Sequence, residues 1–107
     1  MVDLTDLRKA NAARDKEWAK GGDMGLAFHT IELGGECGEL LNKIKKVIRQ
    51  EMGLPGSRTT REEIELEIGD VQICLDLVAM KLGIDTNKAL CRAFNEKSEQ
   101  MGFKTRI

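Results

Sequence analysis

The sequence predicts an all-α protein, a four-helix-bundle-like fold that homo-oligomerisation would complete. Apolar residues recur every three to four positions along most of the 107 residues, which is the period of an α-helix, and no stretch alternates as a half-buried strand would. Glycine, proline and capping residues divide this pattern into four segments. A chain of this length forms one domain, residues 1–107, whose modest core makes help from a partner subunit plausible.

The first two predicted helices are expected at residues 4–20 and 24–52. Two glycines and an aspartate at residues 21–23 separate them, since glycine commonly follows a helix C-terminus. Pro55 cannot continue a helix, so the second helix ends before the loop at residues 53–59.

The third predicted helix begins after Thr60, whose spacing from Glu63 is that of a capping box. It ends before Gly83, which can adopt the left-handed conformation that terminates many helices. Asp85 can cap a fourth helix, which ends near Met101.

The composition is that of an ordinary soluble protein and argues against some partners. The chain is 41% hydrophobic and 33% charged, with a formal net charge of −1 at pH 7. Since no basic patch stands out, we expect neither a nucleic-acid polymer nor a membrane as a partner. No apolar segment has the length of a signal-peptide core or of a spanning helix, so we expect a cytoplasmic protein.

The three cysteines, Cys37, Cys74 and Cys91, lie on apolar faces, which is typical of small buried residues. The chain has one histidine, His29, and this argues against a zinc site. A di-iron site of the ferritin type needs Glu-x-x-His motifs on two helices, and His29 belongs to none.

Acidic residues run down the centre of the apolar face of the third predicted helix. At about 100° per residue, Glu67 and Asp70 lie among the leucines, isoleucines and valines that should face the core. A carboxylate in a core costs several kcal/mol unless it is paired, protonated or bound to a metal, so this placement needs a reason. Glu63 and Cys74 share this line, and the opposite, solvated face is assigned to Glu65, Gln72 and Asp76.

The second predicted helix offers a matching pair, Glu36 and Glu39, also three residues apart. Alone, this pair could be a solvated flank that Lys43 supports one turn beyond Glu39. Together, the two pairs can surround a hard divalent cation with oxygen ligands, which suits Mg²⁺ or Mn²⁺. Glycines beside the pairs would allow close approach of the two helices at this point, or would serve tight helix packing alone (Gly34, Gly35, Gly38 and Gly69).

Oxygen-ligated metal ions commonly bind phosphate chains in proteins. Such ions can neutralise a triphosphate, activate water and stabilise a departing pyrophosphate. The sequence has no phosphate-binding glycine loop, so the metals would hold the phosphates. Basic residues that could assist, each of which could equally be a surface charge, are Lys43, Lys46, Arg58 and Lys97.

A base pocket needs a flat apolar surface and a few hydrogen-bonding groups. In a chain with one Trp and no Tyr, the candidates for the surface are Trp18 and Phe28, and those for polar contacts are Asn11, Arg14 and His29. Trp18 could instead belong partly to the core, and a single histidine is most often structural.

Three short motifs follow one another along the chain: Gly-Glu-Cys-Gly-Glu-Leu at residues 35–40, Glu-Ile-Gly-Asp-Val at residues 67–71 and Asn-Glu-Lys at residues 95–97. In this order and spacing, the first two resemble the Glu-x-x-Glu and Glu-x-x-Asp signature of the MazG-like all-α nucleoside triphosphate pyrophosphatases. The third resembles that family's phosphate-contacting segment. The resemblance covers roughly residues 18–103.

The resemblance implies hydrolysis of a (d)NTP to its monophosphate and pyrophosphate, with Mg²⁺ as cofactor and Mn²⁺ able to replace it. It also implies homo-oligomers, dimers or tetramers, whose neighbouring helices complete the bundle. Family relatives include short phage enzymes that act on particular dNTPs, so dGTP or GTP is our first choice of substrate, in the host cytoplasm if the chain is phage-encoded. The implied catalytic metal ligands are Glu36, Glu39, Glu67 and Asp70, and the implied phosphate contacts are Asn95 and Lys97.

Two other functions stay open. A phosphoribosyl-ATP pyrophosphohydrolase has a similar metal-binding pattern, and an oligomeric helical adaptor could use the same carboxylates to hold a structural cation. Glu32 is an extra carboxylate that could be a ligand, a water-orienting base or neither. Many relatives carry a further basic residue after the Asn and Lys, where this chain has only Lys104 or Arg106.

Overall fold

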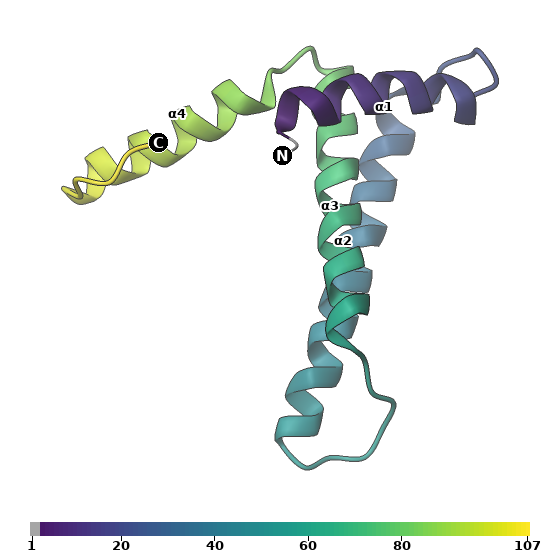
Figure 1. Cartoon of the computed structure of the whole chain (residues 1–107), viewed down its shortest axis with the longest axis vertical. Helices are drawn as coiled ribbons and strands as arrows, with labels where there is room; N and C mark the ends of the chain where they lie inside the picture. Colours follow the sequence, from purple (N-terminus) through teal and green to yellow (C-terminus); the bar gives the residue numbers. More distant parts are fainter. Residues whose placement is uncertain (1–2) are drawn as a thin grey trace.

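The computed structural model describes residues 3–107, and these residues form an all-helical structure (Figure 1). Each predicted helix is present, and its ends lie within two residues of those expected from the sequence. The four helices are α1 (Leu4–Trp18), α2 (Gly25–Glu51), α3 (Arg61–Lys81) and α4 (Thr86–Met101).

The predicted capping residues set the starts and ends of the last two helices. The Thr60 side chain accepts a hydrogen bond from the Glu63 backbone N–H at the start of α3, and Asp85 does the same for Lys88 at the start of α4. Gly83 has a φ of +68°, the left-handed conformation expected after α3. The Glu63 carboxylate accepts a hydrogen bond from the Thr59 hydroxyl, so the cap of α3 relies on Thr60.

The four helices of the chain do not close into a bundle. Helices α2 and α3 lie antiparallel along their length, α1 crosses the end opposite their connecting loop, and α4 extends away from the hairpin (Figure 1). The radius of gyration is 17.0 Å, whereas a compact domain of this length has one of roughly 13 Å. The single chain is therefore an open arrangement with long uncovered helix faces.

The apolar core of this arrangement is small. Among residues 3–107, the buried hydrophobic side chains are Cys74, Leu77 and Ala79, all on α3. Large apolar side chains stay exposed on every helix, as Ile31 and Leu66 do with exposures of 77% and 71%. Cys37 is half-buried and Cys91 is exposed, so the expectation of three buried cysteines holds for Cys74 alone.

Asp76 corrects the sequence prediction for α3, because it is not on a solvated face. Its side chain is 2% exposed and accepts hydrogen bonds from the Arg8 guanidinium, the Asn11 amide at 3.0 Å and the Thr86 hydroxyl at 3.1 Å. Helix α1 crosses this side of α3, so both sides of α3 are covered at this level. The apolar periodicity of α3 identifies one buried face and does not reveal that α1 crosses the other side of the helix.

The glycines near the paired carboxylates do not mark a close approach between helices within the chain. A Cβ atom built on Gly34, Gly35, Gly38 or Gly69 would meet no other atom within 4 Å. The expectation that these glycines draw α2 and α3 together is therefore wrong for the single chain.

No helix of the described residues is long and apolar enough to cross a membrane.

Candidate metal centre

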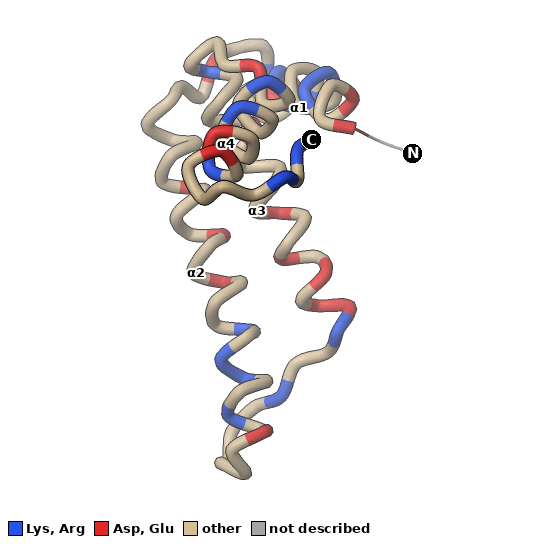
Figure 2. The backbone as a smooth tube through the Cα atoms, turned by 90° about the vertical axis from the view of Figure 1, so that its left-hand side faces the viewer, with Lys and Arg blue, Asp and Glu red and all other residues tan. Residues whose placement is uncertain are grey.

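Three carboxylates converge between the two antiparallel helices. Glu36 projects from α2, and Glu67 and Asp70 project from α3, one turn apart. One oxygen of each group lies within 4.8 Å of an oxygen of the other two. Figure 2 shows acidic residues on the neighbouring stretches of α2 and α3, and basic residues nearer the connecting loop.

The converging carboxylates lack compensating donors. Glu36 Oε2 and Glu67 Oε2 are buried and have no hydrogen-bond partner among the described residues. Burial, followed by the charges of Glu39 and Asp70, raises the pKa of the Glu36 carboxyl, and the same causes in the same order raise the pKa of Glu67. Buried oxygens without donors, on several acids at one point, are the arrangement that a hard divalent cation compensates.

The fourth predicted ligand borders this cluster. Glu39 is exposed and lies outside the group whose oxygens converge, although its charge acts on both Glu36 and Glu67. The donor set is oxygen only and suits Mg²⁺ or Mn²⁺.

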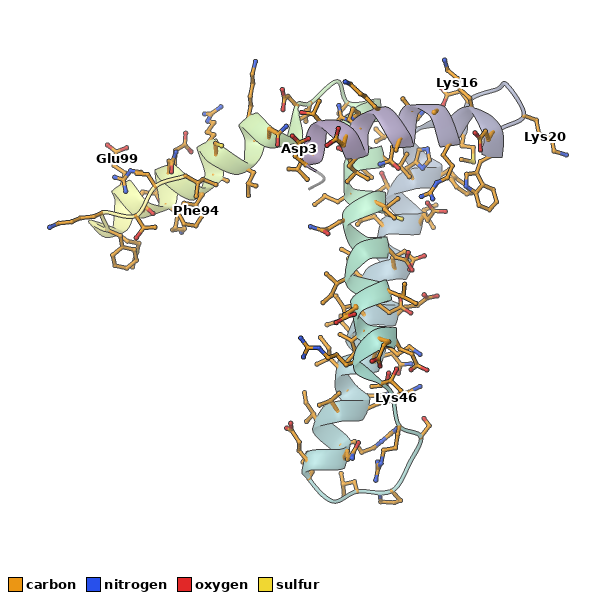
Figure 3. All side chains as sticks on the ribbon, viewed as in Figure 1. Asp3, Lys16, Lys20, Lys46, Phe94 and Glu99 are labelled. Carbon is orange, nitrogen blue, oxygen red and sulfur yellow. The ribbon has the colours of Figure 1, made fainter. Side chains whose placement is uncertain are left out.

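The predicted phosphate-binding residues are dispersed in one protomer. Lys43 Nζ lies 3.4 Å from Glu63 Oε2, Lys46 lies towards the loop end of α2 (Figure 3), and Arg58 donates to the carbonyl of Leu54. Asn95 and Lys97 lie on α4, which points away from the carboxylates, and the Asn95 side chain pairs with the backbone of Ile107. A single chain therefore does not bring this set together.

A cavity of about 320 Å³ adjoins the carboxylates. Its lining includes Glu36 and Asp70, and also every residue predicted to contact a base, namely Asn11, Arg14, Trp18, Phe28 and His29. Ligand pockets range from roughly 300 to 1,000 Å³, so this one can take a compact planar group. The structure thus places the predicted base contacts and two of the predicted metal ligands around one cavity.

Trp18 is 71% exposed, so the alternative that it belongs to the core is wrong for this chain. Asn11, by contrast, is 2% exposed, and both hydrogens of its amide are used by Asp76 and the carbonyl of Ile73. Arg14 is exposed and lines the same cavity.

His29 occupies a fully buried position with an internal partner, as a structural histidine would. Its Nε2 lies 3.0 Å from Asp15 Oδ1, and Asp15 Oδ2 accepts a hydrogen bond of 2.8 Å from Lys81. Its other nitrogen, Nδ1, is buried and has no hydrogen-bond partner among the described residues. It lies 4.0 Å from Glu32 Oε1, which accepts a hydrogen bond from the Cys74 thiol.

Sequence reasoning missed Asp15 and left Glu32 undecided, and both line the cavity. The spacing of Asn11, Asp15 and Trp18 could have revealed the first of these, because residues at i, i+4 and i+7 share one face of a helix. Burial, followed by the hydrogen bond to Glu32, raises the pKa of the Cys74 thiol to about 12. Cys74 is therefore a neutral donor in this site.

Comparisons with known proteins add one relative. The chain is similar to the Gene 37 protein of Mycobacterium phage L5, with 32% identity over 72 residues, which is 67% of this chain and 62% of that protein. The matched region thus spans less than two thirds of the relative, whose name gives no activity. No protein-family model and no solved structure matches the chain.

Proposed function

We propose that this protein is a metal-dependent nucleoside triphosphate pyrophosphohydrolase of the MazG-like all-α kind, which converts a (d)NTP to its monophosphate and pyrophosphate. One observation carries the proposal. Glu36, Glu67 and Asp70 converge, the first two with buried, unpartnered oxygens, beside a cavity whose lining includes the aromatic side chains Trp18 and Phe28. A metal-bound phosphate chain and a stacked base are the two parts of a nucleotide that this pairing fits.

In this proposal the carboxylates hold the metal and the cavity holds the nucleoside. Glu36, Glu67 and Asp70 bind the ion, and Glu39 completes the set from the edge of the cluster. When bound, Mg²⁺ or Mn²⁺ supplies charge neutralisation of the phosphates and an activated water. The exposed Trp18 offers its flat face to the base, and Arg14, which lines the same cavity, is free to contact the ligand.

Attack at the α-phosphorus would yield pyrophosphate rather than orthophosphate. The test is a panel of NTPs and dNTPs, with phosphoribosyl-ATP included, incubated with Mg²⁺ or Mn²⁺ in ¹⁸O-labelled water. We expect pyrophosphate and a labelled monophosphate, with dGTP or GTP as the preferred substrate. Label confined to pyrophosphate would move the attack to the β-phosphorus, whereas turnover of phosphoribosyl-ATP alone would identify the alternative enzyme.

We also propose that the protein is a homo-oligomer, a dimer or a tetramer. On α2, Ile31, Leu41 and Ile48 are exposed and share a helix face with the exposed Gly34 and Gly38, at which another backbone could approach closely. The open shape of the chain supports the same view, because a second copy could cover these faces. A neighbouring copy could also bring Asn95 and Lys97 to the phosphates, which one chain does not.

Light scattering after size exclusion tests this assembly at micromolar concentration. We expect the wild-type protein to have at least twice the mass of one chain, and Leu41→Glu to dissociate it. Gln50→Glu, an exposed change on the same helix, should leave the mass unchanged. A monomer with full activity would contradict the proposed assembly.

A helical adaptor with a structural cation is the second candidate, and the extent of exposed apolar surface favours it equally. Absence of turnover for every nucleotide in the panel, together with metal binding, would support the adaptor. For the enzyme, we infer action in the cytoplasm, where nucleoside triphosphates are found. The similarity to a phage protein is compatible with action in a host cytoplasm.

A further inference from the structure

Three polar side chains on the lining of the cavity offer hydrogen-bond acceptors to a ligand. They are the buried Asn11 and His29 and the half-exposed Glu32, and the buried donor on the same lining, the Cys74 thiol, is already bonded to Glu32. A ligand that enters the cavity must therefore present donors to these groups, because an unmatched buried polar group is costly. This property follows from how each side chain is already engaged within the protein.

His29 presents an acceptor because of its contact with Asp15. A carboxylate accepts hydrogen bonds only, so Nε2, which is 3.0 Å from Asp15 Oδ1, is the donor, and in the corresponding neutral tautomer Nδ1 carries no proton. Nδ1 is then a lone pair, and it is buried and unpartnered in a side chain that is 0% exposed. Lys81 donates a hydrogen bond of 2.8 Å to the other oxygen of Asp15, so both oxygens of that carboxylate are engaged.

Asn11 presents an acceptor for a similar reason. Its amide nitrogen has two hydrogens, and these are donated to the carbonyl of Ile73 at 3.2 Å and to Asp76 Oδ2 at 3.0 Å. Only the amide oxygen is left for a ligand.

Glu32 is the remaining acceptor and the most adaptable one. One oxygen, Oε1, is held by the Cys74 thiol at 3.4 Å and lies 4.0 Å from His29 Nδ1. The gap between these two acceptors is too long for a direct hydrogen bond and short enough for one donor group to bridge. The side chain is 39% exposed and lines the cavity, so its carboxylate is open to a ligand.

We propose that Glu32, held by the Cys74 thiol, selects guanine as the base of the substrate. Guanine carries a ring N–H beside an exocyclic amino group, two adjacent donors that a carboxylate can accept together. The inference rests on the proposed function, since it takes the cavity as the base site. It also makes Glu32 a specificity-determining residue rather than a metal ligand.

The other bases fit this set of acceptors less well. Adenine and cytosine present one amino group beside a ring acceptor, and uracil and thymine present a single N–H between two carbonyls. A ligand acceptor that faces the Glu32 carboxylate is repelled and leaves both groups unpaired. Hypoxanthine keeps the ring N–H of guanine and lacks only the amino group, so it isolates that one contact.

The test compares guanine and hypoxanthine nucleotides in binding and in turnover. Calorimetry with dGMP and dIMP reports recognition without any need for catalysis, and dGTP and dITP report it through kcat/KM. We expect wild-type protein to favour guanine by roughly 10- to 100-fold, the range for a charge-assisted hydrogen bond. Glu32→Gln, which puts a donor opposite the amino group, should bring both ratios close to one, while Glu51→Gln on the same helix leaves them unchanged.

Three outcomes would overturn the proposal: equal affinity for dGMP and dIMP in the wild type, no binding of either at millimolar concentration, or a guanine preference that survives Glu32→Gln. Equal loss of dGTP and dITP turnover in Glu32→Gln, with an unaltered ratio, would also overturn it and make Glu32 a base or a metal ligand. Failure of the enzymatic function looks different. In that case no triphosphate is hydrolysed, and Glu32-dependent preference for dGMP remains.

Discussion

Helix α3 carries a buried acid on one side and half-buried acids on the opposite side, and their surroundings differ. Asp76 accepts hydrogen bonds from Arg8, Asn11 and Thr86, and although burial acts against it, these bonds lower the pKa of its carboxyl. Glu67, nine residues earlier and hence on the opposite side of the helix, has a buried oxygen with no partner and a raised pKa. Both groups are acids on one helix, so the difference lies in what surrounds them.

The contrast separates an acid that stabilises the fold from one that is kept for another purpose. A buried carboxylate with three donors ties together the elements that supply them, here α1, α3 and the start of α4. A cluster of carboxylates without donors weakens the unliganded fold, which supports the proposal of a ligand of opposite charge. Substitutions on the two sides of α3 should therefore have opposite consequences.

The largest effect is expected on activity. Glu67→Gln and Asp70→Asn should each lower kcat/KM for the preferred triphosphate by roughly 10³-fold or more, because removal of a metal ligand removes several kcal/mol of transition-state stabilisation. Steady-state pyrophosphate release, measured over a range of Mg²⁺ concentrations, tests this. Glu62→Gln, an exposed change on the same helix, is the matched control and should behave as the wild type. Near-normal turnover in either ligand variant would refute the metal assignment.

The next effect is on stability and concerns the other side of α3. Asp76→Ala should lower the free energy of unfolding by about 3 kcal/mol, since it leaves Arg8 and Asn11 without their shared acceptor. Urea unfolding at a fixed protein concentration gives this value, with Glu65→Gln as the exposed control on the same helix. A loss no larger than that of the control would mean that the network adds nothing to stability.

The two sides of α3 also show how much of the structure could be predicted from the sequence. Helix ends were predictable because Thr60, Gly83 and Asp85 act on their own neighbours. The convergence of Glu36 with Glu67 was predictable because each of two helices carries a pair of acids at i and i+3, which is a local pattern. The burial of Asp76 depends on α1 crossing α3, a contact between residues far apart in the sequence, and no local pattern encodes it.

The same distinction explains the other corrections. Tryptophan is a residue type that is common in protein cores. Trp18 is nonetheless 71% exposed, because α1 ends beside the cavity. Glu39 shares a motif with Glu36, and only the rotation of α2 relative to α3 decides that it stays outside the converging group. A Cβ atom built on Gly38 would meet no other atom within 4 Å, so any packing role of this glycine depends on a surface outside the chain.

A smaller effect is expected in the cavity that we propose as the base site. Trp18→Ala should raise KM for the preferred nucleotide by roughly 10-fold and change kcat less, because stacking on an aromatic ring contributes about 1–3 kcal/mol while the metal still holds the phosphates. Kinetics with dGTP, dCTP, dUTP and dATP would show whether the preference between bases is reduced. Unchanged KM ratios with a large fall in Tm would assign Trp18 to the fold instead.

The smallest effect is on the stability of the metal-free protein, and its sign is opposite to that of Asp76→Ala. The raised pKa of Glu67 means that the folded state holds a proton more tightly than the unfolded chain. Ionised Glu67 therefore disfavours the fold at neutral pH, and this disadvantage fades as the pH falls through the folded pKa towards the ordinary value of 4.5. Glu67→Gln should give a slightly higher Tm than the wild type at pH 7 in EDTA, and the difference should vanish below pH 4.5.

Asp76 gives the opposite pH dependence in the same melts. Its lowered pKa contributes stability that is present above the ordinary value of 3.8 and is lost as the pH falls through the folded value. The Tm difference between wild type and Asp76→Ala should thus be full at pH 7 and shrink only in strong acid, over a lower pH range than the Tm difference for Glu67→Gln.

Added Mg²⁺ offers a further check on Glu67. It should raise the Tm of the wild type and leave that of Glu67→Gln unchanged, because only the wild type retains the complete set of carboxylates that we propose to bind the ion. A fall in Tm for metal-free Glu67→Gln would mean that this carboxylate, like Asp76, has donors within the folded protein.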